Sequence, residues 1–372
     1  MQKHYRNIGL QNILLITKEF PEEAPGGREL LNKLNLKVLE NIFGPNLKTF
    51  FLPKTNVRTY LGMINAFRGH IDGINISSIQ SCMTIIKEKK IDLVFVDGSN
   101  LGAIVKIGKN LYPNVKFITF FHNAEYYFFK GLWKKNLSLK AFFLMGISYL
   151  VEKNAVSWSD RIIALNQRDA LDIQILYGGK NVAIYPMSLE DKLGTVQPLL
   201  SPQQHDEYAL FVGGFFYANY HGIKWFIKEV VPLINIKIII VGRGFESVRS
   251  ELEIQDKVTV IGSVDDLSQY YLNAKFVVAP IFDGSGMKTK TAEALMYGKK
   301  IIGTDEAFTG YEKYIAEVGW LCNSPKEFAL AIEEATKSIE SYFDPLLRKI
   351  YCANYSIEAA EKKMLKILSQ DT

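Results

Sequence analysis

Short apolar runs alternate with helical patterns along most of the chain, and this alternation most constrains what the sequence can fold into. Continuous runs of Val, Ile, Leu and Phe are typical of parallel strands that are buried on both faces. Helical spacing between such runs predicts a doubly wound α/β fold. The expected strands are 12–17, 47–52, 91–97, 116–121, 161–165, 181–186, 208–213, 236–242, 257–262, 275–280 and 299–304, with helices that include 27–42, 76–89 and 219–233.

The alternation is interrupted once, by the polar stretch 188–207, which contains two prolines and no apolar periodicity. A chain of 372 residues is also long for a single hydrophobic core. We therefore expect two Rossmann-like domains, 1–187 and 208–350, joined by the linker 188–207 and facing each other across a cleft. The helical stretch 351–372 is expected to cross back and pack toward the N-terminal domain.

The charge is unevenly distributed between the two halves. Residues 1–190 contain 24 Lys and Arg against 15 Asp and Glu, a net charge of +9, and residues 191–372 contain 20 against 24, a net charge of −4. A basic half favours an anionic partner, such as nucleic acid, an anionic membrane surface or a phosphorylated acceptor. Nucleic acid is poorly supported because the lysines form no basic tract. The segment 130–153 mixes lysines with aromatic residues, which suits either an anionic membrane surface or an ordinary amphipathic helix packed on the sheet.

The cysteines and the N-terminus bear on the compartment. Three distant cysteines, Cys82, Cys322 and Cys352, form no CxxC motif, so we expect a reducing compartment, no disulfide and no zinc site. The first apolar run is too short for a signal sequence, and the longest, 141–151, is too short to span a bilayer. These features predict a cytoplasmic protein, either free or peripheral at the inner face of the cell membrane.

Polar and glycine-rich segments follow the expected strands, at the edge where parallel sheets bind ligands. In the first half, Gly26 and Gly27 precede a helix, and His122 ends a strand with Asn123 and Glu125 beside it. Glycine lets the backbone approach a ligand closely. As alternatives, the glycine pair could form an ordinary turn, and His122 could cap its own strand.

In the second half, the stretch DGSGMKTKTAEALMYGKKIIGT (283–304) places two lysines where a helix is expected to begin. A helix N-terminus carries partial positive charge, so Lys288 and Lys290 are disfavoured there unless an anion is bound. The unpaired amides of the first turn and two ammonium groups would hold a diphosphate. Glu293, later on the same helix, would accept hydrogen bonds from ribose hydroxyls. Solvated surface lysines are the alternative interpretation.

These motifs resemble those of a known family. The segment 279–311 resembles the sugar-nucleotide signature of family-four glycosyltransferases, which are retaining enzymes of the GT-B fold acting in bacterial polysaccharide and glycan synthesis. The segment 210–234 is similar to the opening of their donor domain, 117–129 to their acceptor-domain histidine loop, and 24–29 to their first glycine loop. The resemblance covers most of the chain.

The resemblance implies a role for individual residues. His122 would contact the donor sugar near the reacting centre, with Lys288 and Lys290 as the other catalytic residues, while Asn123 and Glu125 would lie on the acceptor side. Glu293 would bind the ribose. The implied donor-binding set further contains Gly26, Gly27, Gly213, Gly214, Arg243, Ser263, Val264, Ser285, Gly286, Met287, Thr289 and Thr291.

The sequence departs from the family pattern in two respects. The family usually has two glutamates separated by seven residues, and the first of them contacts the donor sugar. Here Glu293 corresponds to the second glutamate, and Ser285 stands eight positions before it. The family's Arg and Lys after the first donor-domain strand are also missing, so Lys288 and Lys290, with Arg243 as a weaker candidate, would supply the positive charge.

The residues and the resemblance together predict a glycosyltransferase of the hexosyl type. It would move a sugar from a nucleoside-diphosphate sugar to a saccharide or lipid-linked saccharide, with retention and without a metal or other cofactor. A sugar-nucleotide epimerase of the same fold and a non-catalytic sugar-binding protein are the alternatives. An epimerase would convert UDP-GlcNAc with no acceptor present. The absence of GxGxxG after the first strand of either half argues against a nicotinamide dinucleotide.

Overall fold

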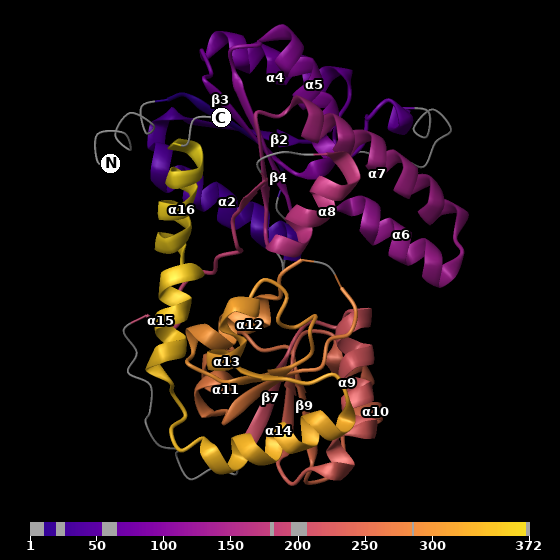
Figure 1. Ribbon diagram of the computed structural model, residues 1–372, viewed down its shortest axis with the longest axis vertical. Coiled ribbons are helices and arrows are strands. Elements are labelled where there is room, and N and C mark those ends of the chain that lie inside the picture. The colour runs from indigo at the N-terminus through magenta and orange to yellow at the C-terminus, as the bar shows by residue number, and fades with distance from the viewer. Residues whose placement is uncertain are drawn as a thin grey trace. The chain divides into compact units, whose positions relative to one another are not determined.

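The computed structural model describes residues 11–19, 27–53, 65–178, 182–194, 207–284 and 286–369. The chain divides into two compact units, Met1–Met187 with Ala360–Thr372 and Ser188–Ala359. Each unit contains one sheet of six strands with helices packed around it (Figure 1).

The first unit has the strand order β2-β1-β3-β4-β5-β6, and every described pairing is parallel. Because β1 lies between β2 and β3, the connections leave it in opposite directions, and this reversal opens a binding position at the carboxyl ends of β1 and β3. The elements are β1 (Ile13–Lys18), α2 (Gly27–Phe43), β2 (Leu47–Leu52), α4 (Ile76–Glu88), β3 (Leu93–Asp97), α5 (Gly102–Leu111), β4 (Lys116–Phe121), α6 (Glu125–Asn136), α7 (Leu139–Trp158), β5 (Arg161–Ala164), α8 (Gln167–Tyr177), β6 (Val182–Ile184) and, from the C-terminus, α16 (Ile357–Ser369).

The second unit has the order β12-β11-β10-β7-β8-β9, again all parallel, and the corresponding reversal lies between β7 and β10. Its elements are β7 (Tyr208–Val212), α9 (Tyr217–Glu229), β8 (Lys237–Val241), α10 (Arg249–Leu252), β9 (Val258–Gly262), α11 (Ser268–Asn273), β10 (Phe276–Ala279), α12 (Thr289–Met296), β11 (Ile301–Gly303), α13 (Ile315–Val318), β12 (Gly319–Leu321), α14 (Pro325–Ser338) and α15 (Pro345–Asn354).

The expected doubly wound α/β architecture is confirmed. All eleven expected strands are present, with ends that differ by at most two residues. The strand β12 was missed because it is only three residues long and follows a short helix directly, so it has no apolar run of its own. Fully buried apolar strand residues, such as Ile16 and Val96 in the first unit and Phe211 and Val278 in the second, explain why continuous apolar runs marked the strands.

Several helices begin where a polar side chain satisfies the free amides of the first turn. Asn75 accepts from the amide of Ser78 at the start of α4, and the Ser78 hydroxyl accepts from the Asn75 amide in return. Ser324 and Glu327 form the same reciprocal pair at the start of α14. These capping boxes terminate the loops that precede the helices.

The C-terminal part of the chain contributes to both units. Tyr351 of α15 donates from its hydroxyl to the Leu189 carbonyl, and Arg348 pairs with Asp191, so the start of the expected linker is ordered within the second unit. The division falls at Ala360, inside α16, rather than at 351. Beyond that point, Glu361 accepts a hydrogen bond from Asn41 of α2 at 2.6 Å.

Candidate functional site

The carboxyl edge of the second sheet, at the reversal between β7 and β10, brings together glycines and the lysine motif. Gly213 and Gly214 follow β7, and the loop after β10 leads into α12. Gly213 sits against two side chains: a Cβ added to it would lie 2.8 Å from Asn219 Nδ2 and 3.0 Å from Lys290 Nζ. Only glycine therefore leaves this recess open beside the ammonium group.

Lys290 is the cation of this recess. Its Nζ donates to Asn219 Oδ1 at 2.8 Å and lies 4.6 Å from the centre of the Phe211 ring. Asn219 in turn donates to the Gly214 carbonyl at 2.8 Å. The lysine is only 6% exposed, and burial lowers its pKa to about 7, against the opposing effect of Glu293. No carboxylate among the described residues forms an ion pair with it, so an anionic ligand would supply the missing charge.

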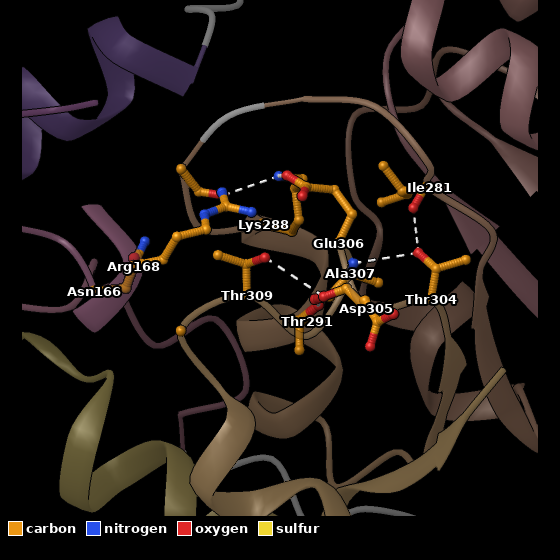
Figure 2. Close-up of polar contacts among 12 residues, drawn as sticks. Asn166, Arg168, Ile281, Lys288, Thr291, Thr304, Asp305, Glu306, Ala307 and Thr309 are labelled. Carbon is orange, nitrogen blue, oxygen red and sulfur yellow. Dashed lines mark hydrogen bonds and ion pairs between the residues drawn. The ribbon is translucent and has the colours of Figure 1, made fainter. Parts of the chain in front are cut away.

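Lys288 has a different environment, although it is only two residues away. Its Nζ forms an ion pair with Glu306 Oε1 at 2.7 Å and donates to the Gly286 carbonyl at 2.9 Å (Figure 2). Tyr311 donates from its hydroxyl to the Lys288 carbonyl at 2.9 Å. The charge of Lys288 is thus balanced within the protein, and the residue anchors the loop before α12.

The start of α12 has the features of an anion-binding helix end. Lys288 is the N-cap residue, and its side chain makes no capping hydrogen bond to the first-turn amides. Thr289 is the first helical residue, so its amide is one of those that an α-helix leaves unpaired. Gly286 has a φ of +68°, a conformation that favours glycine. Met287 is buried and packs against Gly310, where an added Cβ would lie 2.6 Å from its Cγ.

Two further residues of α12 differ in what they offer a ligand. Thr291 is fully buried, and its hydroxyl donates to the Ala307 carbonyl at 2.8 Å (Figure 2), so it holds the helix to the following loop. Glu293 accepts from the Tyr271 hydroxyl at 3.0 Å through Oε2. The Tyr271 ring is stacked on Tyr297 at 4.7 Å. This packing fixes one carboxylate oxygen and leaves Oε1 without a partner among the described residues.

The remaining donor candidates lie at the ends of β8 and β9. Arg243 is exposed, and its carbonyl accepts from the Phe215 amide at 2.8 Å. Gly242 approaches the chain after β7 so closely that an added Cβ would lie 1.8 Å from the Gly213 carbonyl oxygen. Ser263 is exposed and Val264 half-buried directly after β9. These positions share the sheet edge with Lys290, as parallel strand ends do.

In the first unit, His122 belongs to a buried polar cluster. Its Nε2 lies 3.1 Å from Asp97 Oδ1, close in distance but not aligned as a hydrogen bond. Asp97 is buried at the end of β3 and accepts from Thr17 and Asn35, at 3.1 and 3.0 Å. Asp97 and Asn35 were not among the expected site residues, because they read as the end of an apolar strand and the buried face of a helix.

A charged network adjoins this cluster. Asp72 accepts from Lys18, Arg28 and Asn100, with its oxygens at 2.7, 3.3 and 3.1 Å from them. Burial acts to raise the pKa of Asp72, but Arg28 and Lys18 outweigh it and hold the value at about 2. Arg28 also lies 3.5 Å from Glu125. Of the residues in this network, only Arg28 could have been suspected from the sequence, because it directly follows the glycine pair.

The acceptor-side candidates have separate environments. Glu125 is buried, which raises the pKa of its carboxyl group although Arg28 opposes the shift. Glu152 of α7 accepts from the Glu125 amide at 2.8 Å and from the Tyr177 hydroxyl at 2.6 Å, and burial raises the pKa of Glu152 to about 7. Asn123, the residue that directly follows His122, is half-buried. Glu152 therefore positions the start of α6.

Three expected residues remain to be placed. Gly27 is exposed and begins α2. Gly26 and Ser285 lie outside the described residues. Among the described residues, no group of three or more His, Cys, Asp and Glu is arranged to hold a metal ion.

Comparison with known proteins places this geometry in a family context. Residues 206–338 match the family model described as Glycosyl transferases group 1. No curated protein sequence matches the chain significantly. The solved structures that resemble it include a sucrose-phosphate synthase from Thermosynechococcus elongatus, with 16% identity and a TM-score of 0.69 over 96% of this chain and 98% of that one.

Two further structures resemble the whole chain. One is Anabaena HepE in complex with UDP, with 14% identity and a TM-score of 0.66 over 96% of this chain and 100% of that one. The other is the lipopolysaccharide outer core galactosyltransferase WaaB in its apo form, with 13% identity and a TM-score of 0.66 over 96% and 98% of the two chains.

The match and the shared architecture agree with the motifs in the sequence. Residues 206–338 match the Glycosyl transferases group 1 model, and the two six-stranded parallel sheets are those of the GT-B fold. The expectations of a GT-B fold and of a glycosyltransferase enzyme of this type are thereby confirmed.

Proposed function

We propose that this glycosyltransferase takes its sugar from a nucleoside-diphosphate sugar bound at the carboxyl edge of the second sheet. The observation that carries the proposal is Lys290, a buried ammonium group held by a neutral amide, Asn219, in a recess that Gly213 keeps open. The Anabaena HepE structures were solved with UDP, with UDP and glucose, and with UDP-glucose. These ligands make a uridine diphosphate sugar the first donor to test.

The chemistry of transfer explains why a cation belongs in this recess. As the bond between the anomeric carbon and the diphosphate oxygen breaks, negative charge grows on the leaving diphosphate. Preorganised donors in a site shielded from water stabilise that charge. Lys290 and the unpaired amides at the start of α12 would supply these donors, and Glu293 would hold the ribose. We propose that no metal takes part in this stabilisation.

Retention of configuration is the second part of the proposal. The acceptor hydroxyl would attack from the face that the diphosphate leaves, and a leaving phosphate oxygen would take the hydroxyl proton. The new glycosidic bond forms as the old one breaks, so no protein nucleophile is needed. Ser285 cannot give the carboxylate contact to the donor sugar that a glutamate would provide.

The acceptor is proposed to be a saccharide that binds the first unit. Asp72 is ionised at neutral pH, and Glu125 and Asn100 lie in the same network, so oxygen acceptors for sugar hydroxyls are available there. His122 would contact the donor sugar from this unit. We further propose that the saccharide is lipid-linked and that the enzyme works in the cytoplasm as a peripheral protein at the membrane. In the described part of the chain, none of the helices is long and apolar enough to cross a bilayer.

A thermal-shift panel tests the donor. The protein would be heated with UDP, GDP, CMP, UDP-sugars and GDP-sugars, each with and without EDTA. A ligand present at 100 times its dissociation constant adds about 2.7 kcal/mol to the free energy of unfolding. Stabilisation by one nucleotide class, unchanged by EDTA, would support the proposal. Stabilisation by none of them, or one that EDTA abolishes, would contradict it.

A matched pair of variants tests the residue that carries the proposal. Lys290→Ala should abolish both the nucleotide shift and sugar transfer. Lys228→Ala, which removes an 80% exposed lysine of α9 in the same unit, should leave both unchanged. Normal turnover in Lys290→Ala would show that the diphosphate binds elsewhere.

A further inference from the structure

The helices α6 and α7 form a hairpin that extends away from the sheet of the first unit (Figure 1). The hairpin presents large apolar side chains to solvent. Leu137 and Leu139, at the turn, are 76% and 74% exposed, and Phe143 is 55% exposed. The other exposed members are Phe128, Leu132, Phe142 and Leu150. We name these seven residues the hairpin surface. Extended apolar surfaces of this kind mark binding sites in soluble proteins.

The pattern of α7 shows that packing within the unit does not account for the hairpin surface. One face of α7 is buried through residues such as Ile147, Val151 and Ala155. Phe143 and Leu150 lie outside that buried set and are apolar as well. A helix that only covers a core has a polar outer face. The outer face of α7 therefore has the composition of a surface that contacts something apolar.

The charges that the two helices of the hairpin themselves present to solvent all have one sign. Lys130, Lys134, Lys140 and Lys153 are exposed or half-buried on the two helices. The carboxylates of α6 and α7 are those of Glu125 and Glu152, and both are buried. The solvent-facing charge of the described hairpin is thus entirely positive.

Aromatic contacts join the two helices of the hairpin and place rings beside its lysines. The ring of Trp133 on α6 lies 5.6 Å from that of Phe142 on α7, which joins the two helices. The ammonium group of Lys130 lies 5.6 Å and 5.5 Å from the ring centres of Tyr126 and Tyr127. Aromatic rings beside lysines are typical of protein segments at the boundary between acyl chains and headgroups.

We propose that the α6–α7 hairpin docks on an anionic lipid bilayer, with the hairpin surface at the acyl boundary and the lysines at the lipid phosphates. The inference rests on the proposed function, since a lipid-linked acceptor would be met at that surface. Charge complementarity selects this occupant: a second copy of the chain would bring like charges together, whereas anionic lipid neutralises the lysines while the apolar side chains enter the boundary.

Vesicle flotation tests the docking directly. The full chain would be mixed with vesicles of phosphatidylcholine alone and with vesicles of equimolar phosphatidylcholine and phosphatidylglycerol, at low and at high salt. We expect flotation with the anionic vesicles only, weakened by salt because the lysine contribution is screened. Equal binding to both vesicle types, or binding to neither, would overturn the proposal.

Matched variants locate the surface. Leu139→Ser with Phe143→Ser should abolish flotation, and Leu330→Ser with Leu346→Ser, which are 56% and 48% exposed in the second unit, should not. All four positions are exposed, so the thermal midpoint should be nearly unchanged in both double variants. Loss of flotation in the control pair alone would place the docking surface on the second unit.

Charge reversal gives an independent test. Each lysine near an anionic surface contributes about fivefold to binding, so Lys140→Glu should weaken partitioning by roughly thirtyfold. Lys87→Glu, at an exposed position at the end of α4 in the same unit, is the control and should change partitioning far less.

Failure of the docking proposal is distinguishable from failure of the proposed function. The hairpin variants should keep the thermal shift with the nucleotide, since Lys290 lies in the other unit. Flotation without any nucleotide shift would retain the docking and refute the donor site. A nucleotide shift without flotation would do the opposite. A dimer that forms in solution through the hairpin and is lost in Leu139→Ser with Phe143→Ser would assign the surface to a second copy.

Discussion

The ammonium group of Lys290 provides a prediction whose size follows from its surroundings. Burial lowers its pKa to about 7, so about half of the unliganded molecules lack the proton at neutral pH. A diphosphate in the recess interacts with the charged form only, and it would restore the pKa to its ordinary range. Donor binding should therefore take up a proton, and its affinity should depend on pH.

The magnitude can be worked from that value. With a pKa of about 7, the protonated fraction falls from roughly 0.9 at about pH 6 to roughly 0.1 at about pH 8. If only the protonated form binds, the affinity should fall about tenfold across this range. The sign is fixed by the depressed pKa of the free site: the proton is present before binding at low pH and must be gained at high pH. At about pH 7 the uptake should be about 0.5 proton per donor bound.

Titration calorimetry with UDP-glucose measures both quantities. This donor is preferable to UDP because its diphosphate has no terminal phosphate group that titrates in the same range. Proton uptake appears as a difference in binding enthalpy between two buffers of unlike ionisation enthalpy at one pH. Repeating the titration at three pH values gives the change in affinity.

Two variants separate Lys290 from other titrating groups. Lys290→Arg keeps its charge throughout the range, so any donor affinity that remains should be independent of pH. Lys228→Met removes an exposed lysine and should retain the behaviour of the unmodified protein. A pH-independent affinity in the unmodified protein, with no proton uptake, would refute the assignment of Lys290 as a partly deprotonated diphosphate ligand.

Three further substitutions have expected outcomes that follow from the geometry. Gly213→Ala should weaken donor binding about tenfold or more, because its Cβ would lie 3.0 Å from the buried ammonium group of Lys290. Gly214→Ala is the control and should bind the donor normally, because its Cβ would meet nothing nearer than 4.0 Å. Equal losses of donor affinity in the two variants, measured by calorimetry, would contradict the role of Gly213. Lys288→Met should lower the free energy of urea unfolding by about 1–3 kcal/mol, since the partly buried ion pair between Lys288 and Glu306 is lost; an unchanged denaturation midpoint would disprove it. Lys299→Met removes a buried group that donates to three backbone carbonyls and should cost about 2–4 kcal/mol. Because burial holds the pKa of Lys299 at about 7, below its unfolded value, the loss should grow as the pH rises above 7, and a loss that shrinks would reverse the argument.

The fold followed from the sequence because its signals are local. A strand buried on both faces in a parallel sheet shows as an apolar run, and a helix that packs on that sheet shows as a period of 3.6 residues. The glycines and lysines of the second unit could also be found, since the carboxyl ends of strands are identifiable once the strands are. The strand β12 gave no such signal, because it follows the short helix α13 directly and has no separate apolar run.

The partners of the site residues could not be predicted in the same way. Asn219 lies 71 positions from Lys290, and Asp72 lies 44 from Arg28. Such pairs depend on how each helix is rotated about its axis and on the course of loops, and neither leaves a periodic signal. Asp97 is also hidden by its context, since a buried carboxylate that ends an apolar strand looks like an ordinary boundary residue.

The difference between Lys288 and Lys290 shows that the groups in contact with a lysine decide whether it can bind an anionic ligand. Both lysines occur in one motif, and both were expected to meet the diphosphate. Lys288 precedes the helix in an extended conformation and pairs with a carboxylate, which neutralises it. Lys290 lies in the first turn and is held by an amide oxygen, which orients the ammonium group but adds no negative charge. A dianionic ligand therefore interacts more favourably with Lys290 than with Lys288. The pKa of Lys290 is lowered because its ammonium group is buried, and no carboxylate among the described residues forms an ion pair with it before the ligand binds.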